Sequence, residues 1–516
     1  MWQGARTRRI PQSADAVTPT LEQHRVHRLG ADEFAGRRVH LIGIGGSGMR
    51  GAAAILLRRR AIVSGSDTHR SDETLRLEKS GVSVSMGQRA ENLAPDVHLV
   101  VYSAAIKPDN PELMEARRRG LETIKYAELL GRLMRGREGI AVAGTHGKST
   151  TTAMTAFILQ RAGLDPSFVV GARVEQLGGG SGVGDGAHFV VEACEFDRSF
   201  LHLEPKYAAI LNVEDDHLDY YKNGLDEIVG AFSAFAGLVP SDGVLVVNKE
   251  NRAATTAAQN AIGTVETFGL VTGATWQALG CEAKRGCYRF QIARNGNVVG
   301  ETRLQIAGLH HVANALAATA LCFHSGVPID AILRILPEFR GVQRRLTLRG
   351  QINGITVLDD YGHHPTEIQA TLRAARDQYQ AKRLWVVFQP HQHSRTRFLL
   401  ADFARSFGSA DIVIVPDIYF VRDSESERER VTARDLVERI HLNGGDARYE
   451  PAFDRIVGEL ARSVKPGDVV LTMGAGDVWR VADGLVSELT GCDPVGEFVP
   501  FGGHALLNLR DLRDVG

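Results

Sequence analysis

Short apolar runs alternate along this chain with longer segments in which apolar residues recur at helical spacing. Apolar runs that end in polar residues are typical of buried parallel strands, and their alternation with helices predicts sheets covered by helices on both faces. The expected strands cover residues 38–42, 61–67, 98–103, 139–143, 189–192, 207–212, 355–360, 383–388, 412–415 and 468–472. One helix is expected to follow the glycine turn after residue 42 and to end near residue 60, and another begins after residue 148. Further helices are expected over 311–325 and near 329–336.

These elements form three α/β blocks, and a chain of 516 residues is too long for a single hydrophobic core. The predicted domains are residues 29–138, 139–342 and 343–516. Residues 1–28 are polar and mixed, so we expect a flexible extension. Within the second block, residues 262–306 are expected to be rich in strands, and the glycine-rich stretch 178–186 is expected to be a loop.

Charge and cysteine content narrow the class of protein. The 60 basic and 61 acidic residues nearly cancel, so nothing favours nucleic acid or an anionic membrane as the main partner. The five cysteines are scattered and lack metal-ligand spacing, which fits a reducing cytosol. No apolar run is long enough for a transmembrane helix, and no apolar core follows the N-terminal arginines as in a signal peptide. We therefore expect a cytoplasmic protein.

The most informative motif lies between the expected strand 139–143 and the helix that follows it. It reads Gly144-Thr145-His146-Gly147-Lys148-Ser149-Thr150. In such a loop the backbone N–H groups point at phosphate oxygens, the lysine reaches the β- and γ-phosphates, and the hydroxyl of Ser149 can hold Mg²⁺. The common pattern has a glycine at position 142, where this chain has valine, so the loop is shorter than usual.

A second glycine motif opens the first block. Gly43, Gly45 and Gly48 have the spacing of a dinucleotide fingerprint, and Asp67 follows about twenty residues later. This pattern predicts a diphosphate at a helix N-terminus, and NAD, FAD and a nucleotide-sugar all remain open.

Polar residues at strand ends indicate further chemistry, because ligands of parallel sheets bind beyond the carboxyl ends of the strands. Glu192 and the pair Asp216-His217 are expected to face Lys148 and Ser149, which predicts a Mg²⁺ site. In the third block, Asp359 to His364 and then His391, His393 and Arg395 form a dense set of titratable groups. A zinc site built from these histidines is an alternative, although no Cys/His spacing supports it.

Taken together, the motifs resemble those of the Mur ligases, the ATP-dependent amide-forming enzymes of peptidoglycan synthesis. The resemblance spans residues 37–490. The matching stretches are residues 43–49, 64–67, 103–106, 110–113, 144–150, 192–197, 212–217, 308–315, 344–345, 360–365 and 474–477. It implies a three-domain α/β fold with a Rossmann-like N-terminal domain, a P-loop ATP-binding central domain and a Rossmann-like C-terminal domain.

The resemblance is strongest to members that join L-alanine to the lactyl carboxylate of UDP-N-acetylmuramate through an acyl phosphate. It implies ATP and Mg²⁺ as cofactors and a monomer or homodimer. A ligase that adds a recycled peptide to the same nucleotide-sugar is the closest alternative. An NAD-dependent oxidoreductase and a P-loop switch ATPase are more distant ones, because neither accounts for both glycine motifs.

The resemblance also implies roles for individual residues. The catalytic set is Lys148, His217, His363 and Arg395. The ATP-binding set is Gly144, Thr145, His146, Gly147, Lys148, Ser149, Thr150, His310, Asn314, Arg345 and Tyr361. The UDP-sugar set is Gly45, Gly46, Ser47, Gly48, Met49, Asp67 and Ser103, and the metal set is Ser149, Glu192 and His217.

The chain departs from the family pattern at four positions. Ser149 stands in place of threonine, which keeps the hydroxyl, and His311 stands where asparagine is usual. Cys194 replaces an aspartate, and Gln392 replaces an arginine expected near the incoming amino acid. The Gln392 change leaves L-alanine, glycine and L-serine open as the amino acid, with Arg395 available to hold its carboxylate.

Overall fold

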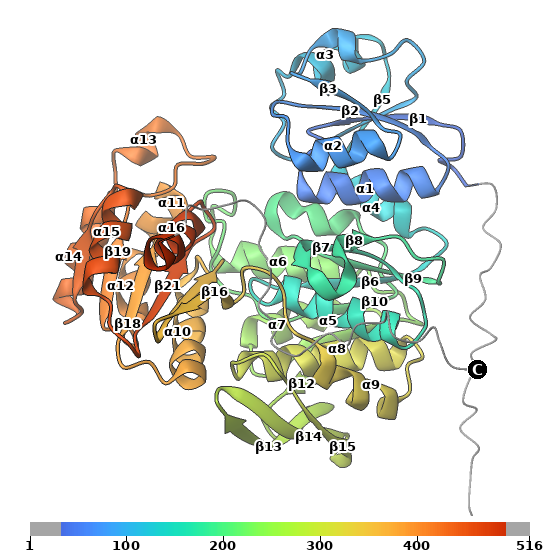
Figure 1. The fold of residues 1–516 in the computed structure, drawn as a ribbon. Coiled ribbons are helices and arrows are strands. Elements are labelled where there is room, and N and C mark those ends of the chain that lie inside the picture. Colours follow the sequence, from blue (N-terminus) through green and yellow to red (C-terminus); the bar gives the residue numbers. More distant parts are fainter. Residues whose placement is uncertain (1–31, 492–516) are drawn as a thin grey trace, which may run out of the picture.

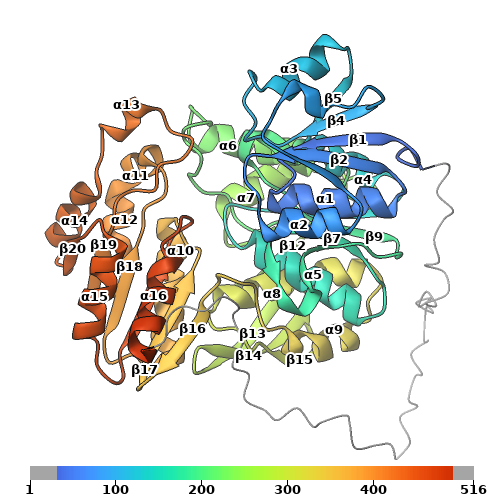
Figure 2. The same ribbon diagram turned by 45° about the horizontal axis from the view of Figure 1, so that its top comes forward.

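The computed structural model describes residues 32–491, and the extension predicted over residues 1–28 lies outside them. Three α/β domains follow one another along the chain, each built on its own sheet (Figure 1). The first domain (blue) rests on the central domain (green to yellow), and the C-terminal domain (orange to red) lies beside the central domain in both Figures 1 and 2. The predicted fold class is confirmed.

The first domain has five parallel strands in the order β3-β2-β1-β4-β5. The strands are β1 (Arg38–Ile42), β2 (Ile62–Asp67), β3 (Ser83–Met86), β4 (Leu99–Tyr102) and β5 (Glu122–Lys125). The helices are α1 (Ser47–Arg58), α2 (Asp72–Lys79), α3 (Pro111–Arg118) and α4 (Tyr126–Met134). Apolar residues of α1 and α4 belong to the same buried cluster as residues of the central sheet, so these two domains share a core.

The central domain is built on a ten-stranded sheet in the order β15-β14-β13-β12-β11-β10-β6-β9-β7-β8. Its strands are β6 (Glu138–Ala143), β7 (Ser167–Val174), β8 (Gly179–Gly182), β9 (His188–Glu192), β10 (Tyr207–Ile210), β11 (Val244–Asn248), β12 (Thr264–Gly269), β13 (Trp276–Lys284), β14 (Cys287–Arg294) and β15 (Asn297–Arg303). Helices α5 (Lys148–Arg161), α8 (His310–His324) and α9 (Ile329–Ile335) share one core, and α6 (Leu225–Ala236) and α7 (Arg252–Ala257) belong to the other.

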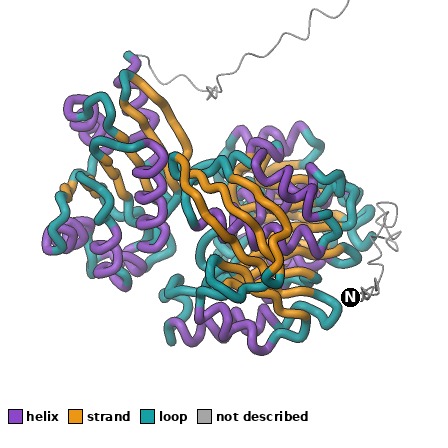
Figure 3. The backbone as a smooth tube through the Cα atoms, turned by 90° about the horizontal axis from the view of Figure 1, so that it is seen from below, coloured by secondary structure: helices purple, strands orange, loops and turns teal. Residues whose placement is uncertain are grey.

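The C-terminal domain has six strands in the order β16-β17-β21-β18-β19-β20, and only β16 runs antiparallel to its neighbour. The strands are β16 (Thr347–Ile352), β17 (Ile355–Asp360), β18 (Leu384–Phe388), β19 (Ile412–Val415), β20 (Ala447–Tyr449) and β21 (Val469–Met473). The helices are α10 (Pro365–Tyr379), α11 (His393–Phe398), α12 (Leu400–Ser406), α13 (Glu425–Arg428), α14 (Ala433–Leu442), α15 (Phe453–Ser463) and α16 (Trp479–Thr490). Strands (orange) run between helices (purple) in the view of Figure 3.

One expectation about secondary structure is wrong. The stretch expected to be a loop at 178–186 contains the edge strand β8, which pairs antiparallel with β7. A Cβ on Gly180 would come 2.8 Å from the carbonyl oxygen of Ala172, and one on Gly182 would come 2.3 Å from the Phe168 ring. Here glycine permits the close approach of a backbone at Gly180 and of an aromatic ring at Gly182, a role that the composition of the segment does not reveal.

Among the described residues, no helix is both long and apolar enough to cross a membrane.

Candidate active site

The phosphate loop joins β6 to α5 and is held in one conformation by its neighbours. The N–H of Thr145 donates to the carbonyl of Asn212 at 3.0 Å, and that of His146 donates to Asn212 Oδ1 at 2.7 Å. Gly147 has φ of 81°, and a Cβ there would lie 2.8 Å from Asn314 Oδ1. The positive φ and the close contact together require glycine at this position. The loop places the N-terminus of α5 at the carboxyl end of β6, where it can bind an anion.

Lys148 is the first residue of α5, and its ammonium group is surrounded by acceptors. Nζ lies 2.6 Å from the carbonyl oxygen of Gly144, 3.1 Å from that of Thr145 and 2.9 Å from the carboxylate of Glu195. Burial alone would lower the pKa of Lys148, but the Glu195 carboxylate raises it above its usual value. Lys148 is therefore a fixed positive charge at neutral pH, and Glu195 is a partner that the sequence analysis did not assign.

The three predicted metal residues, Ser149, Glu192 and His217, line one cavity of about 420 Å³ together with Lys148. Ligand atoms of Glu195, Asp216 and His217 lie within 4.8 Å of one another.

His217 has φ of 52°, which is uncommon for a non-glycine residue, and its Nε2 lies 3.8 Å from Glu195 and 3.7 Å from Asp216. Its Nδ1 is buried and makes no hydrogen bond within residues 32–491. The donor set fits a divalent cation, and its oxygens suit Mg²⁺. It consists of three carboxylates, a hydroxyl and the unused nitrogen of an imidazole, from Glu192, Glu195, Asp216, Ser149 and His217.

A second cavity, of about 150 Å³, adjoins the phosphate loop on the side of α8. Its walls include His310, Asn314 and Arg345 beside Gly147. The predicted adenosine residue Tyr361 lies elsewhere, because it lines the larger cavity with Lys148. Arg345 spans the two cavities, and its guanidinium carbon lies 5.4 Å from the centre of the Tyr361 ring.

The C-terminal domain contributes His363 and Arg395 to the larger cavity. Burial lowers the pKa of His363 to about 4, so the imidazole is neutral at pH 7. Arg395 forms an ion pair with Asp216: its Nε donates to Asp216 Oδ1 at 2.9 Å, and its Nη2 lies 2.9 Å from the same oxygen. Burial would raise the pKa of Asp216, but Arg395 and His217 hold it well below its usual range. This ion pair joins the C-terminal domain to the central domain.

The third-block histidines of the alternative zinc site form no ligand cluster of their own within residues 32–491, and His364 lies instead near His146 and Glu214 of the central domain. His393 Nδ1 lies 3.0 Å from the carbonyl of Val431, and the ring of His391 stacks on Tyr419. Neither histidine belongs to a ligand cluster in the part of the chain that the structure describes.

In the first domain, Asp67 fixes the glycine loop from within. Its Oδ2 accepts the N–H of Gly45 at 2.8 Å, and its Oδ1 accepts the N–H of Thr68 at 2.8 Å. Gly46 is the N-cap of α1, which starts at Ser47, and Met49 is buried. Both carboxylate oxygens of Asp67 are thus used by the backbone, whereas a dinucleotide fingerprint would have the acid on a ribose. The loop leads directly into the N-terminus of α1, the kind of helix end that binds anions.

Models of three domain families match the chain in order. They are described as the Mur ligase family catalytic domain over residues 38–138, the Mur ligase middle domain over 142–322 and the Mur ligase glutamate ligase domain over 344–476. The chain belongs to the Mur ligase family. Each match covers the sheet of one domain, although the middle-domain match begins within β6, so family and fold agree.

Two relatives of this Mur ligase carry the same name. The UDP-N-acetylmuramate–L-alanine ligase of Caldanaerobacter subterraneus subsp. tengcongensis is 42% identical over 454 residues, which are 88% of this chain and 98% of the relative. The ligase of that name from Acetivibrio thermocellus is 42% identical over 87% of this chain and 95% of its own length.

Solved structures include both kinds of ligase considered above. UDP-N-acetylmuramate–alanine ligase from Thermotoga maritima has a TM-score of 0.73 at 29% identity, covering 88% of this chain and 99% of that one. The murein peptide ligase of Psychrobacter arcticus has a TM-score of 0.67 at 26% identity, covering 89% of this chain and 100% of that one.

Proposed function

We propose that this Mur ligase joins L-alanine to the lactyl carboxylate of UDP-N-acetylmuramate and converts ATP to ADP and phosphate. The single observation that carries the reaction class is the larger cavity, where Lys148 of the phosphate loop meets His363 and Arg395 of the C-terminal domain. Relatives that match along nearly their whole length and bear this name support the choice of substrates.

The chemistry answers a simple difficulty, since a carboxylate oxygen is a poor leaving group. A lactyl carboxylate oxygen attacks the γ-phosphorus of ATP, the bond from that phosphorus to the bridging oxygen breaks, and ADP leaves. The amine of L-alanine then attacks the acyl carbon and loses a proton, and phosphate leaves from the tetrahedral intermediate. The protein's task is to position the reactants and neutralise charge.

Each part of this task has proposed residues. Lys148 and the first turn of α5 (Ser149, Thr150) neutralise the phosphates, and His310, Asn314 and Arg345 border the adenosine. The first-domain loop (Gly45, Gly46, Ser47, Gly48, Met49) holds the UDP, together with Ser103 just after β4, and Asp67 fixes this loop by accepting the N–H of Gly45. His363 faces the reacting groups, and the Arg395–Asp216 pair fixes the C-terminal domain beside them.

Magnesium fits the donor set described above. Ser149 and Glu192 would hold one ion, and His217, with Glu195 and Asp216 beside it, would hold a second. Bound Mg²⁺ neutralises phosphate charge and polarises phosphoryl oxygens.

Replacing Glu192 with alanine is expected to raise the Mg²⁺ concentration needed for half-maximal activity by at least about tenfold, because a carboxylate ligand is lost. A Mg²⁺ titration of phosphate release measures this. Glu204→Ala, on a half-exposed glutamate of the same domain, is the matched control and should titrate like the unmodified protein. An unchanged titration for Glu192→Ala would remove it from the metal site.

The proposed substrates are tested by varying the amino acid and by leaving out the nucleotide-sugar. Phosphate release is measured with ATP and UDP-N-acetylmuramate while L-alanine, glycine, L-serine and a peptide substrate of the recycling reaction are supplied in turn. We expect release that needs the nucleotide-sugar and is fastest with L-alanine. Faster turnover with the peptide would assign the chain to the recycling reaction, and ATP hydrolysis without the sugar would reject both ligase functions.

A further inference from the structure

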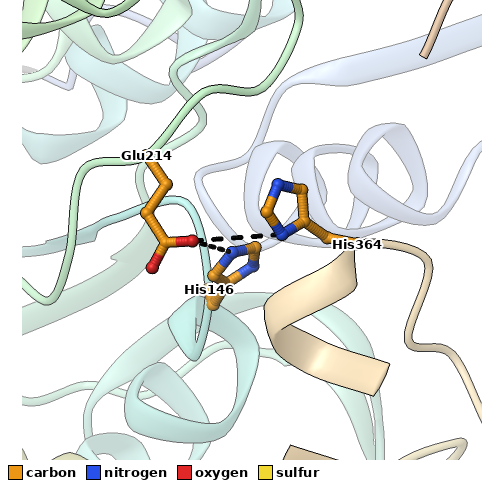
Figure 4. A group of neighbouring side chains, drawn as sticks. All are labelled: His146, Glu214 and His364. Carbon is orange, nitrogen blue, oxygen red and sulfur yellow. Dashed lines mark ion pairs between the residues drawn. The ribbon is translucent and has the colours of Figure 1, made fainter. Parts of the chain in front are cut away.

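His146 of the phosphate loop lies between two carboxylates from different domains. Its Nε2 is 3.4 Å from Glu214 Oε2 in the central domain, and its Nδ1 is 3.4 Å from Glu367 Oε1 on α10 of the C-terminal domain. Figure 4 shows His146 with Glu214 and His364 around it. The side chains of His146 and Glu367 are only 12% and 11% exposed, so solvent screens this contact weakly.

Further contacts between the same two domains surround His146. Thr366 Oγ1 donates to Glu214 Oε2 at 2.6 Å, and His364 Nε2 lies 3.1 Å from the carbonyl oxygen of Asp215. The rings of His364 and His146 are 4.5 Å apart. We call His146, Glu214, His364, Thr366 and Glu367 the interdomain clasp.

Within the clasp, Glu367 also reaches two other residues of the site. Its Oε2 accepts the N–H of His363 at 3.0 Å, and its Oε1 lies 3.5 Å from Arg345 Nη1. One carboxylate therefore contacts the phosphate loop, the arginine between the two cavities and the histidine of the larger cavity. Nothing in the chemistry proposed above uses this carboxylate.

We propose that Glu367 is a positioning residue that holds the C-terminal domain closed on the phosphate loop through His146. Glu214 supports this arrangement by contacting both His146 and Thr366 of the C-terminal domain. The idea rests on the proposed function for its effect on turnover, but its effect on nucleotide binding does not depend on the identity of the other substrates. His146, Arg345 and Glu367 all line the smaller cavity beside the loop, so loss of the clasp loosens the wall of that cavity.

The charge state of His146 supports this arrangement. Burial alone would lower the pKa of His146, but Glu214 and Glu367 raise it to about 9. The pKa of the facing His364 is lowered, mainly by burial and then by the charge of His146, and Arg345 lies beyond Glu367. Because the pKa of His146 is raised in the closed form, the contribution of its charge to the clasp is fully present below the ordinary histidine pKa and is lost as pH rises from there to about 9.

The positive charge of His146 argues against a metal ion at the group formed by His146, Glu214 and His364. Ligand atoms of His146, Glu214 and His364 lie within 4.8 Å of one another, as at a three-ligand site. A protonated imidazole has no lone pair to offer, so binding a cation here at neutral pH would first require removal of a proton from the ring, whose charge two carboxylates stabilise.

The test is ADP binding in the presence of Mg²⁺, measured by calorimetry between pH 6 and 10 on the full chain. For Glu367→Gln we expect a Kd about tenfold higher at pH 7.5, because a buried charged contact is lost. We also expect the pH at which binding weakens to fall from near 9 toward the ordinary histidine value. Glu214→Gln should move both quantities in the same direction, and it remains informative if Glu367→Gln folds poorly.

Asp377→Asn is the matched control, since Asp377 is an exposed acid on the same helix α10. It should leave the Kd and the pH dependence unchanged. A Kd for Glu367→Gln within twofold of the unmodified value, with the same pH dependence, would overturn the proposal. In turnover, a positioning role predicts that the KM for ATP rises more than kcat falls. Absence of turnover in the unmodified protein would instead reject the proposed function and leave the binding test intact.

Discussion

Lys148→Ala is expected to lower kcat for phosphate release by about 10³-fold, because it removes the one lysine that the structure places in the phosphate loop. The ammonium group is buried, held by the carbonyls of Gly144 and Thr145, and kept charged by Glu195. Its replacement leaves the charge that develops on the transferred phosphoryl group without its nearest counter-charge. Phosphate release under saturating substrates measures the loss.

Two controls separate this effect from a loss of fold. Lys148→Ala leaves the buried Glu195 without its partner, so Lys148→Ala/Glu195→Gln removes that unpaired charge and should be as inactive while unfolding near the normal temperature. Lys206→Ala removes a partly exposed lysine of the same domain and should retain full activity. Near-normal turnover in Lys148→Ala would contradict the assignment of the loop.

Arg395→Ala is expected to lower kcat/KM for L-alanine by about 10²–10⁴-fold. The substitution breaks a buried ion pair, which costs about 3–5 kcal/mol because Asp216 keeps its charge without a partner. Since this pair spans the central and C-terminal domains, the cost falls on the closed arrangement in which the cavity is complete. Arg395→Lys should rescue only part of the loss, because an ammonium group does not reproduce the guanidinium contacts.

Asp216→Asn tests the same pair from the other side, and a double-mutant cycle with Arg395→Ala should show strong coupling. The matched control is Arg397→Ala on the same helix α11, whose partner Glu427 is partly exposed, and it should cost less than about 1 kcal/mol. If Asp216→Asn had no effect on turnover and Arg395→Ala alone were inactive, Arg395 would act on the substrate directly, as the resemblance first implied.

Much of the fold could be predicted from the sequence because the central strands are continuous apolar runs. β1, β6, β10, β18 and β19 are almost wholly buried, and this burial produces the pattern that the sequence displays. Strands β3, β5 and β16 have mixed exposure, and β8 is made of glycine and serine, so pairing with neighbours defines them.

Some residues of the candidate site can be predicted from the sequence, and others cannot. The glycines around Lys148 are recognisable because the loop needs positive φ and close approach at Gly147. Glu195 and Glu367 carry no local signal that assigns their roles. The place of Asp216 after a strand predicts a position at the metal site, but nothing local predicts its ion pair with Arg395. These roles arise from contacts between residues far apart in the chain, such as Arg395 with Asp216. Asp67 shows the converse, since its spacing suggested a ligand contact and its oxygens accept backbone N–H groups.

The most direct test of the account follows one oxygen atom. UDP-N-acetylmuramate labelled with ¹⁸O in both lactyl carboxylate oxygens is turned over with ATP and L-alanine, and the phosphate released is examined by mass spectrometry. Activation of the carboxylate through an acyl phosphate predicts one ¹⁸O atom in each phosphate and an amide product that retains the other. Unlabelled phosphate, formed at the same rate as the product, would contradict the account.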